Sequence, residues 1–525
     1  MPRTYSNVAV PDFRNQPLTD FSQPAERAAM EAALARVAGQ LGARYPLRIG
    51  GRPVATTEEL RSTNPSRPSQ VVGIHSAADA ALARRAVEQA HGYFPQWSAV
   101  AAAGRAEVLF AAARILRQRR HEFSAWMIYE VGKTWPEADA DTAEAIDFCE
   151  FYAREALRLA EPQALTGVAG ENNALYYLPL GAGVVIPPWN FPLAIAAGMT
   201  TAALAAGNTV VLKPSSDSPT IAATLVEALL EAGCPPEALS LVPGSGGAIG
   251  DALVDHPLTR FVAFTGSKEV GLRINERAAR HQPGQRWIKR VVAEMGGKDA
   301  IVVDSDCDLE KAVDGVLASA FGFQGQKCSA CSRAIVVDDV YDRFLEQLVE
   351  KARRLAVGPA EDPNHYMGPV INERALKSIL GYIEAGRQEG RLVAGGSRTG
   401  SDGYFLEPTI IADVDHSARI FQEEIFGPVL AVTRARDFDH ALELANDSEY
   451  GLTGGVFTRD RAKLDRAGRD FFVGNLYLNR KCTGALVGAH PFGGFNMSGT
   501  DSKAGGRDYL LLFTQAKVVA ERLGG

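Results

Sequence analysis

Between residues 181 and 300, short runs rich in β-branched residues alternate with longer segments whose apolar residues recur at helical spacing. The β-rich runs read GVVIP, TVVLKP, LSLVP and RFVAFTG, and a helical pattern follows each of them. Strands that alternate with helices in this way are joined by right-handed crossovers, which make them parallel and cover both faces of their sheet. The alternation therefore predicts a doubly wound α/β domain of the kind that binds nucleotides.

The same alternation resumes after Ala300. The runs DAIVVD, RAIVVDD, FGPVLAVTRA and GLTGGVFT predict further strands, with helices that start at Asp308 and Val340. A chain of 525 residues also exceeds what one ordinary hydrophobic core holds. We therefore expect two α/β domains.

The flanking segments have other patterns. Residues 1–40 combine an irregular arm with the helical pattern AERAAMEAALARVAGQL, residues 41–75 hold short strand-like pieces around the turn-rich centre STNPSRPSQ, and residues 77–160 predict successive amphipathic helices. Residues 161–178 carry a Gly-Glu-Asn-Asn centre between apolar flanks, which predicts two strands joined by a turn. A lone hairpin needs support. The C-terminal LLLFTQAKVVAERL, or another subunit, could supply the partner strand.

Composition excludes several classes of protein. The 55 basic and 62 acidic residues give a net charge of −7 without a long run of one sign, which argues against nucleic acid as the main partner. Six cysteines are few for this length and indicate a reducing, cytoplasmic compartment. The chain starts without an apolar stretch of signal-peptide length and has no uncharged run of about 18 residues, so we expect neither secretion nor membrane spanning.

One cysteine stands in a polar, glycine-punctuated stretch. Cys328 lies in FGFQGQKCSACSR, beside Lys327. A neighbouring cation and backbone N–H groups favour the thiolate, which is the nucleophilic form of cysteine. A buried thiol that packs against Cys331, or a Cys-x-x-Cys redox pair, are the alternatives, although the flanking sequence lacks the thioredoxin arrangement.

Two further motifs carry groups that could act with such a sulfur. In VIPPWNFP, three prolines fix the backbone around Asn190, as a preorganised oxyanion donor requires. In AEMGGKDA, Glu294 ends an apolar strand before paired glycines and is a candidate general base. A proline-rich turn with a local Asn hydrogen bond and an ordinary exposed glutamate are the simpler interpretations.

Two strand ends are candidates for binding a nucleotide. FTGS closes one strand, and Gly266 and Ser267 open the next helix, but the spacing is not GxGxxG. Ser267 could equally be an ordinary helix cap. Lys213 ends another strand before Pro214, where it could reach a ribose or be a solvated charge.

Together, PPWNFP, FTGS, EMGGK, GQKCSA and QEEIFGPV, in this order, resemble the aldehyde dehydrogenase superfamily over about residues 45–515. The resemblance implies an α/β fold of two doubly wound domains, one binding the cofactor and one catalytic, plus a small β-hairpin oligomerisation flap. It implies that Cys328 is the nucleophile, Asn190 the oxyanion donor and Glu294 the base. The cofactor residues that it implies are Ile186, Pro188, Trp189, Lys213, Ser216, Gly266, Ser267, Gly296, Glu424 and Phe426.

On this basis we divide the chain into an N-terminal arm (1–40), a cofactor-binding domain (41–160 and 179–293), a flap (161–178 and 500–525) and a catalytic domain (294–499). The expected assembly is a homodimer or a ring of dimers such as a hexamer. NAD is the expected cofactor. Ser216 stands where NAD-preferring members commonly have glutamate, so NADP use stays open. No metal site is expected.

The segment GNLYLNRKCTGALVGAHPFGGFNMSGTDSKAGG is similar to the Δ1-pyrroline-5-carboxylate dehydrogenase subgroup. That resemblance implies oxidation of the small molecule L-glutamate γ-semialdehyde to L-glutamate, the second step of proline degradation, through a thiohemiacetal and a thioester. The substrate residues that it implies are Phe191, Ser329, Gly484, Ala485 and Phe492. Gly and Ala permit the close backbone approach that a carboxylate needs. A flexible surface loop is the alternative for TGALVG.

Three other functions are alternatives to this one. A related enzyme such as succinate semialdehyde dehydrogenase would use the same machinery with another anchor. A reductive member of the fold needs no deacylating base, and a silent scaffold needs none of the three catalytic residues, so Glu294, Asn190 and Cys328 argue against both. The proline-oxidising half of bifunctional proline-utilisation proteins has no room in 525 residues, so we expect a separate enzyme to supply the substrate.

Overall fold

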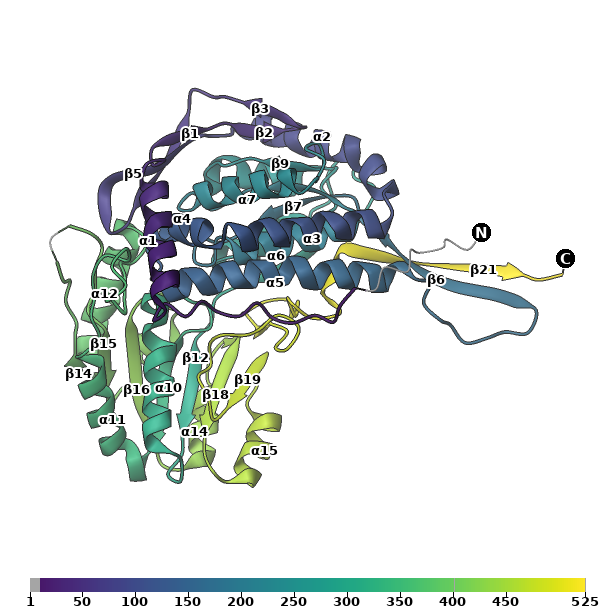
Figure 1. Ribbon diagram of the computed structural model, residues 1–525. Coiled ribbons are helices and arrows are strands. Elements are labelled where there is room, and N and C mark those ends of the chain that lie inside the picture. The colour runs from purple at the N-terminus through teal and green to yellow at the C-terminus, as the bar shows by residue number, and fades with distance from the viewer. Residues whose placement is uncertain (1–9, 401, 525) are drawn as a thin grey trace.

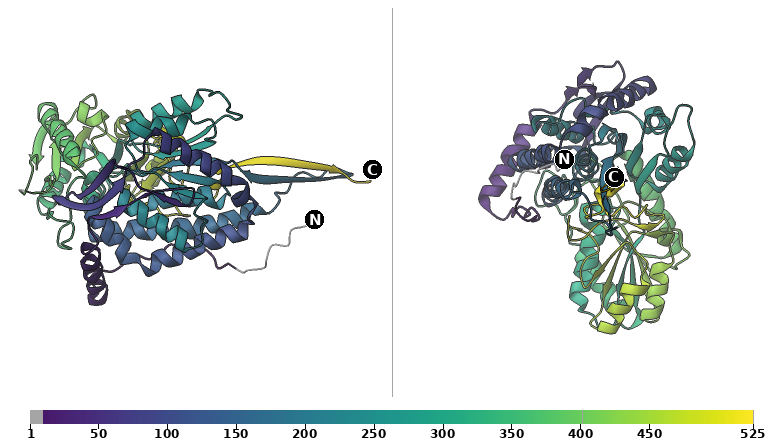
Figure 2. Two further views of the ribbon diagram at one scale, coloured as in Figure 1. Left: turned by 90° about the horizontal axis from the view of Figure 1, so that it is seen from above. Right: turned by 90° about the vertical axis from the view of Figure 1, so that its right-hand side faces the viewer.

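The protein is described by a computed structural model that covers residues 10–400 and 402–524. Two α/β bodies lie one above the other, and a long two-stranded flap projects from the upper body (Figure 1). Viewed from above, the flap extends well beyond the helices, with the C-terminus at its tip (Figure 2).

The upper body is built on a seven-stranded sheet of order β11-β10-β7-β8-β9-β2-β3. Its strands are β2 (Leu47–Ile49), β3 (Arg52–Val54), β7 (Ala182–Ile186), β8 (Thr209–Leu212), β9 (Leu239–Leu241), β10 (Phe261–Thr265) and β11 (Arg290–Glu294). The five strands from β7 to β11 are parallel, as the alternating pattern predicts. The chain runs from β7 outward to β8 and β9, then returns to the other side of β7 with β10 and β11.

Helices cover both faces of this sheet. The helices are α2 (Ala80–Ala99), α6 (Ala194–Ala205), α7 (Pro219–Glu231), α8 (Asp251–Asp255) and α9 (Lys268–Ala279), with a π-helical turn at Gly246–Gly250. α2 and α8 pack on one face, and α6 and α7 on the other. Behind α6 and α7 lie α1 (Pro24–Ala38), α3 (Ala102–Gln118), α4 (Arg120–Val131) and α5 (Trp135–Ala160). The helices α2, α3, α4 and α5 confirm the prediction of successive helices over residues 77–160.

A small sheet of order β1-β5-β4 flanks the upper body and corrects one prediction. Its strands are β1 (Ala43–Tyr45), β4 (Glu59–Asn64) and β5 (Arg67–Ser76). Most of the expected turn-rich centre is therefore strand, because β4 and β5 pair antiparallel across it. Only the residues between these strands form the turn, and Pro65 supplies the break.

The lower body is built on a second seven-stranded sheet, of order β14-β15-β16-β13-β12-β18-β19. Its strands are β12 (Asp299–Val303), β13 (Cys331–Val337), β14 (Arg391–Ala394), β15 (Thr409–Ala412), β16 (Val429–Ala435), β18 (Thr453–Phe457) and β19 (Asn475–Leu478). All neighbours are parallel except β14 and β15. The second α/β domain is thus confirmed as a separate sheet with its own core.

The helices of the lower body are α10 (Leu309–Phe321), α11 (Asp338–Ala352), α12 (Glu373–Glu389), α13 (Arg419–Gln422), α14 (Phe438–Asn446) and α15 (Arg461–Asp470). Short elements complete the chain: 3-10 turns at Gly322–Gly325 and Tyr509–Phe513, and the pair β17 (Tyr450–Gly451) with β20 (Phe495–Asn496). None of the described helices combines the length and the apolar character that a bilayer crossing needs.

The flap joins β6 (Glu171–Pro179) to β21 (Thr514–Arg522) in an antiparallel pair along its full length. The C-terminal segment is therefore a partner strand, as predicted, but the expected local hairpin is wrong. The first arm of that hairpin contributes only a single bridge, between Gln163 and Leu175. Pro162 and Gly167 explain this, because proline lacks a ladder donor and glycine weakens a strand.

Candidate active site

The site lies where the two sheets meet. The carboxyl ends of β7, β8, β10 and β11 share one edge of the upper sheet, and the order reverses between β7 and β10, which is where doubly wound sheets bind ligands. The chain passes directly from Glu294, at the end of β11, to Asp299, at the start of β12. Cys328 precedes β13, so it stands at the opposite, amino-terminal edge of the lower sheet.

The loop that carries Cys328 has an unusual backbone. After α10, Phe323 (φ 49°), Gln324 (φ 57°) and Gly325 (φ 68°) are successively left-handed. Side chains other than glycine seldom adopt this conformation, and such strain persists only where surrounding contacts impose it. The buried Gln324 amide donates to the carbonyls of Gly132 (3.2 Å) and Pro369 (2.8 Å). These contacts hold the loop in a shape that the sequence alone would not select.

Asn190 ties the upper sheet to this loop. Its buried side-chain amide donates to the carbonyl of Gln326 at 3.0 Å, two residues before Cys328. The local Asn hydrogen bond of the simpler interpretation is therefore replaced by a contact between the two bodies. An amide nitrogen carries two N–H groups. Asn190 can thus keep this bond and donate a second one to a ligand.

The paired glycines after Glu294 leave room for two neighbours. A Cβ on Gly296 would lie 2.1 Å from a carboxylate oxygen of Glu424, and a Cβ on Gly297 would lie 2.5 Å from the carbonyl oxygen of Cys328. The Gly297 N–H also donates to Glu424 at 3.1 Å. The close backbone passage predicted for EMGGK is thus used to seat both the cysteine loop and a carboxylate.

Glu294 is held by three donors. Its carboxylate accepts hydrogen bonds from the Ser502 hydroxyl (2.5 Å), the Ser502 N–H (3.2 Å) and the Gly494 N–H (3.2 Å). These bonds lower its pKa, but burial outweighs them and raises the pKa to about 7. A carboxylate that titrates near neutral pH is suited to general-base work.

The state of Cys328 differs from the prediction. Lys327 does not serve the sulfur, because its ammonium group pairs with Glu137 of α5 at 2.7 Å. Burial and the negative charges of Asp299, Glu424 and Glu294 raise the pKa of the Cys328 thiol well above its usual value. The expectation that Lys327 favours the thiolate is therefore wrong for this state of the protein.

Cys328 and Glu294 open into one cavity. The predicted substrate residues line the same cavity: Phe191, Ser329, Gly484, Ala485 and Phe492. Gly484 is left-handed (φ 78°), so the loop turns its backbone sharply at this point. The structure thus brings the sulfur, the base and the glycine-containing loop together from three distant parts of the chain.

Sequence reasoning missed Glu144. It lies on the wall of the cavity, and burial raises its pKa to about 8, with Asp141 adding to the effect. Glu137, Asp141 and Glu144 recur at intervals of four and three along α5, so they share one helix face. This repeated acidic face on a buried helix was the available signal.

A buried cation fixes one aromatic wall. The Lys133 ammonium group lies 3.9 Å from the ring centre of Phe191 and 4.3 Å from that of Phe323, and it pairs with Asp141 at 3.2 Å. Cation–π contacts between desolvated groups are worth about 2 kcal/mol. The Phe191 ring is therefore held from behind by a charge that the sequence analysis did not identify.

The predicted cofactor residues form two groups at the shared edge. Near the cysteine loop, Trp189 packs edge-on against Phe426 with ring centres 5.5 Å apart, and Glu424 lies against Gly296. Ile186 ends β7, and Pro188 follows it. Burial raises the pKa of Glu424 to about 7.

The second group lies further along the edge, outside the cavity that contains Cys328. The buried Lys213 ammonium group donates to the Pro214 carbonyl (3.1 Å), and burial lowers its pKa to about 8. Ser267 caps α9 by accepting from Val270 N–H (3.4 Å), as the simpler interpretation states. Gly266 donates its N–H to the carbonyl of Glu294 (3.1 Å), and the half-buried Ser216 lies between β8 and α7.

These groups fit a dinucleotide. The buried Lys213 and the half-buried Glu424 are ionisable groups that a bound polar ligand could satisfy, and α9 presents its N-terminus at the edge between them. A helix N-terminus suits phosphate, and a carboxylate and an ammonium group suit ribose hydroxyls.

The remaining cysteines are free; Cys331 and Cys482 are buried, and the thiol of Cys482 donates to the Ser329 carbonyl at 3.4 Å.

Comparison with known proteins agrees with this geometry. A sequence model of the aldehyde dehydrogenase family matches residues 53–519. The chain is 57% identical over 512 residues to a 1-pyrroline-5-carboxylate dehydrogenase of Geobacillus kaustophilus (98% of this chain, 99% of the relative) and 54% identical over 509 residues to one of Bacillus subtilis (97% and 99%). A crystal structure of 1-pyrroline-5-carboxylate dehydrogenase from Thermus with bound NAD superposes with a TM-score of 0.97 at 51% identity, covering 98% of this chain and all of that one.

Proposed function

The chain belongs to the aldehyde dehydrogenase family, and we propose that it oxidises L-glutamate γ-semialdehyde to L-glutamate with NAD, the second step of proline degradation. The observation that carries the proposal is one shared cavity. Cys328 and Glu294 line it together with Glu144 and the loop at Gly484. One end of the cavity can react with an aldehyde, and the other has groups for an amino acid.

The anchoring end matches the substrate group by group. The α-carboxylate would accept hydrogen bonds from the backbone N–H groups at Gly484 and Ala485 and from the Ser329 hydroxyl. The α-ammonium group would pair with Glu144, whose carboxyl group needs a cation to ionise readily. Phe191 and Phe492 would flank the aliphatic middle. The cyclic pyrroline opens to this aldehyde by hydrolysis without the enzyme.

At the reacting end, the Cys328 thiol gives its proton to water, and the resulting thiolate attacks the aldehyde carbon to form a thiohemiacetal. The oxyanion is held by the second N–H of the Asn190 amide and by the Cys328 backbone N–H, both fixed before substrate arrives. Oxidation of the thiohemiacetal to the thioester needs a hydride acceptor, which is the chemistry that a nicotinamide held by Glu424 and Phe426 would supply. Glu294 then takes a proton from water, which attacks the thioester and frees L-glutamate and the thiol.

The cofactor residues are proposed as two sets. Glu424, Phe426, Trp189 and Gly296 would hold the nicotinamide ribose beside the cysteine loop, with Ile186 and Pro188 forming the strand end below it. Lys213, Ser216, Gly266 and Ser267 would hold the adenosine ribose and the phosphates. A carboxylate at position 216 would repel a 2′-phosphate, and Ser216 does not, so NADP belongs in the same assay.

We also propose a homodimer, or a ring of dimers, in the cytoplasm. The flap exposes apolar side chains along both strands, including Tyr176 (37% exposed), Leu178 (38%) and Val518 (60%). A projecting two-stranded ribbon of this kind is marginally stable alone and gains from a partner surface. The division of the chain into an arm, a cofactor-binding domain, a catalytic domain and a flap is proposed from its similarity to the aldehyde dehydrogenase family.

The test is turnover of glutamate γ-semialdehyde with NAD and NADP side by side, with Cys328→Ala as the blank. We expect reduction of NAD that depends on Cys328. Succinate semialdehyde has a carboxylate but no ammonium group and is one carbon shorter, so it is the competing substrate. A higher kcat/KM for succinate semialdehyde would overturn the assignment in favour of that related activity.

A further inference from the structure

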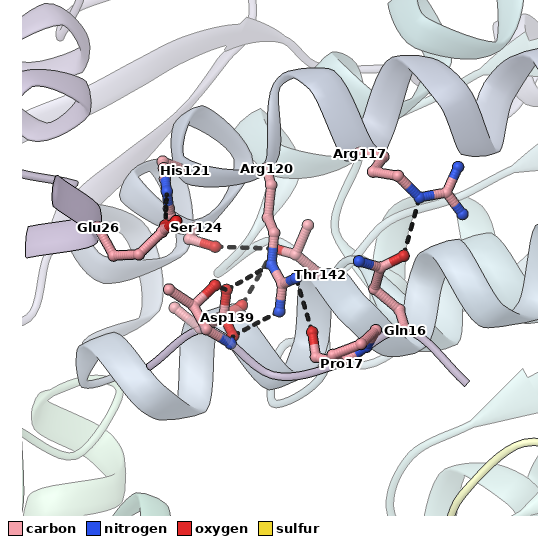
Figure 3. Close-up of polar contacts among 11 residues, drawn as sticks. Gln16, Pro17, Glu26, Arg117, Arg120, His121, Ser124, Asp139 and Thr142 are labelled. Carbon is pink, nitrogen blue, oxygen red and sulfur yellow. Dashed lines mark hydrogen bonds and ion pairs between the residues drawn. The ribbon is translucent and has the colours of Figure 1, made fainter. Parts of the chain in front are cut away.

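The segment of residues 10–23 crosses the outside of α5 as a strap before α1 begins (Figure 1). The C-terminal half of the strap is bound to the helices through Asp139. This carboxylate accepts hydrogen bonds from the N–H (2.8 Å) and hydroxyl (2.7 Å) of Thr19 and from Nε and Nη2 of Arg120 (2.6 Å each). Arg120 also donates to the Pro17 carbonyl at 2.8 Å (Figure 3). The buried Asp139 thus makes the strap a fixed part of the upper body.

The other half of the strap reaches the substrate loop. The side-chain amide of Asn15 donates to Asp147 of α5 at 2.8 Å and to the carbonyl of Val487 at 2.9 Å. Asp147 also accepts the N–H of Gln16 at 2.7 Å. Val487 lines the cavity two residues after Ala485. One amide therefore joins the loop to the helix that carries Glu144.

Aromatic packing fixes the next residue of the loop. The ring of Phe13 lies edge-on to Phe151 of α5, with centres 5.2 Å apart. Gly488 is left-handed (φ 79°), and a Cβ there would lie 3.1 Å from each of these two rings. The Gly488 N–H donates to the Gly505 carbonyl at 2.8 Å. The strap therefore presses the loop against the body of the protein at two consecutive residues.

We propose that Asn15 is a positioning residue for substrate binding: it holds the Val487 carbonyl so that the N–H groups at Gly484 and Ala485 stay aimed at the substrate carboxylate. The inference rests on the proposed function. The loop needs such a restraint because it turns at left-handed Gly484 and at Gly488 and has no regular secondary structure between them. Asn15 touches neither the substrate position nor Cys328, so it acts on binding and leaves the chemistry intact.

The experiment compares two aldehydes in the full-length enzyme. Glutamate γ-semialdehyde needs the loop, whereas propanal has no carboxylate and reports only the reacting end. For Asn15→Ala we expect the KM for glutamate γ-semialdehyde to rise about tenfold, with kcat and the kcat/KM for propanal within about twofold of wild type. Asn15→Asp keeps the shape but replaces two donors by a carboxylate facing Asp147, so its KM should rise further.

Gln16→Ala is the matched control. The Gln16 side-chain oxygen accepts from Arg117 of α3 at 2.8 Å (Figure 3), so its partner belongs to another element than the substrate loop. This variant should keep the wild-type KM while losing a comparable surface contact. If Asn15→Ala fails to fold, Phe13→Leu loosens the packing on Gly488 without burying an unpaired polar group, and its KM for glutamate γ-semialdehyde should rise about threefold with propanal unaffected.

The outcomes are distinct. If wild type turns over glutamate γ-semialdehyde and the Asn15 variants keep its KM, the inference is wrong. An equal loss of kcat/KM for both aldehydes would also overturn it, since that result indicates general damage. A wild-type enzyme without activity on glutamate γ-semialdehyde would instead contradict the proposed function.

Discussion

The two ends of the cavity are built in different ways. At the reacting end, Cys328, Asn190 and Glu294 stand on strand ends and on one strained loop. Asn190 and Glu294 are fixed by hydrogen bonds to the backbone, and the Gln324 amide fixes the loop that carries Cys328. At the anchoring end, Glu144 comes from the face of a long helix, and the loop at Gly484 depends on the N-terminal strap. The reacting groups are thus positioned by the sheets and the loop between them, whereas the groups that anchor the substrate are positioned by a helix and a strap outside the sheets.

The largest effect should come from the reacting end. Cys328→Ala removes the proposed nucleophile and leaves the cavity otherwise intact, so turnover of glutamate γ-semialdehyde should fall by more than about 1,000-fold. The measurement is the formation of reduced cofactor. Binding of the substrate should survive, because the anchoring groups are untouched; loss of binding together with turnover would show that the two ends are not separate.

The next effect separates the two half-reactions. Glu294→Gln keeps the shape but cannot take a proton from water, so steady-state turnover should fall by about 100-fold to 10,000-fold. Acylation should remain. Rapid-mixing experiments should therefore show a burst of about one reduced cofactor per subunit, followed by slow turnover. Absence of the burst would contradict a role limited to hydrolysis of the thioester.

At the anchoring end, Glu144→Gln removes the proposed partner of the substrate ammonium group. A charge-assisted hydrogen bond contributes about 1.5–3 kcal/mol, so the KM for glutamate γ-semialdehyde should rise about 10-fold to 100-fold. Succinate semialdehyde has no ammonium group and should bind the variant as it binds wild type. An equal change for both aldehydes would show that Glu144 shapes the cavity rather than reading the substrate.

The smallest effect is a shift in pH dependence. As the proposed base, Glu294 acts in its carboxylate form, and its pKa is about 7, so kcat should be lost as the pH falls through 7. Hydrogen bonds from Ser502 lower this pKa, and burial raises it. Ser502→Ala removes one donor, so the midpoint of the kcat profile should move to higher pH. A midpoint that stays in place would mean that the profile reports another group.

The same contrast explains what sequence could predict. The reacting end was predictable because PPWNFP, EMGGK and GQKCSA are short and local, and both α/β domains follow from strands and helices that alternate along the chain. Asn15 was not, because its partners Asp147 and Val487 lie far away in the sequence. For Glu144 the acidic spacing along α5 was the one signal, and it does not show which cavity that helix face lines. Even the contact of Lys327, the sequence neighbour of Cys328, was predicted wrongly. Adjacency to Cys328 suggested a thiolate, but the ammonium group points to Glu137 instead.

Ser502 and Glu294, which are joined by hydrogen bonds, lie 208 residues apart in the sequence. The flap likewise pairs β6 with β21, the last strand described. During synthesis, the ribosome therefore releases the cysteine loop well before the segment that orients the base. A nascent chain that already holds Cys328 and the whole upper sheet lacks the donors for Glu294 and the second strand of the flap. Competence for hydrolysis of the thioester and the second strand of the flap are consequently acquired together, only after residues 502–522 have been synthesised.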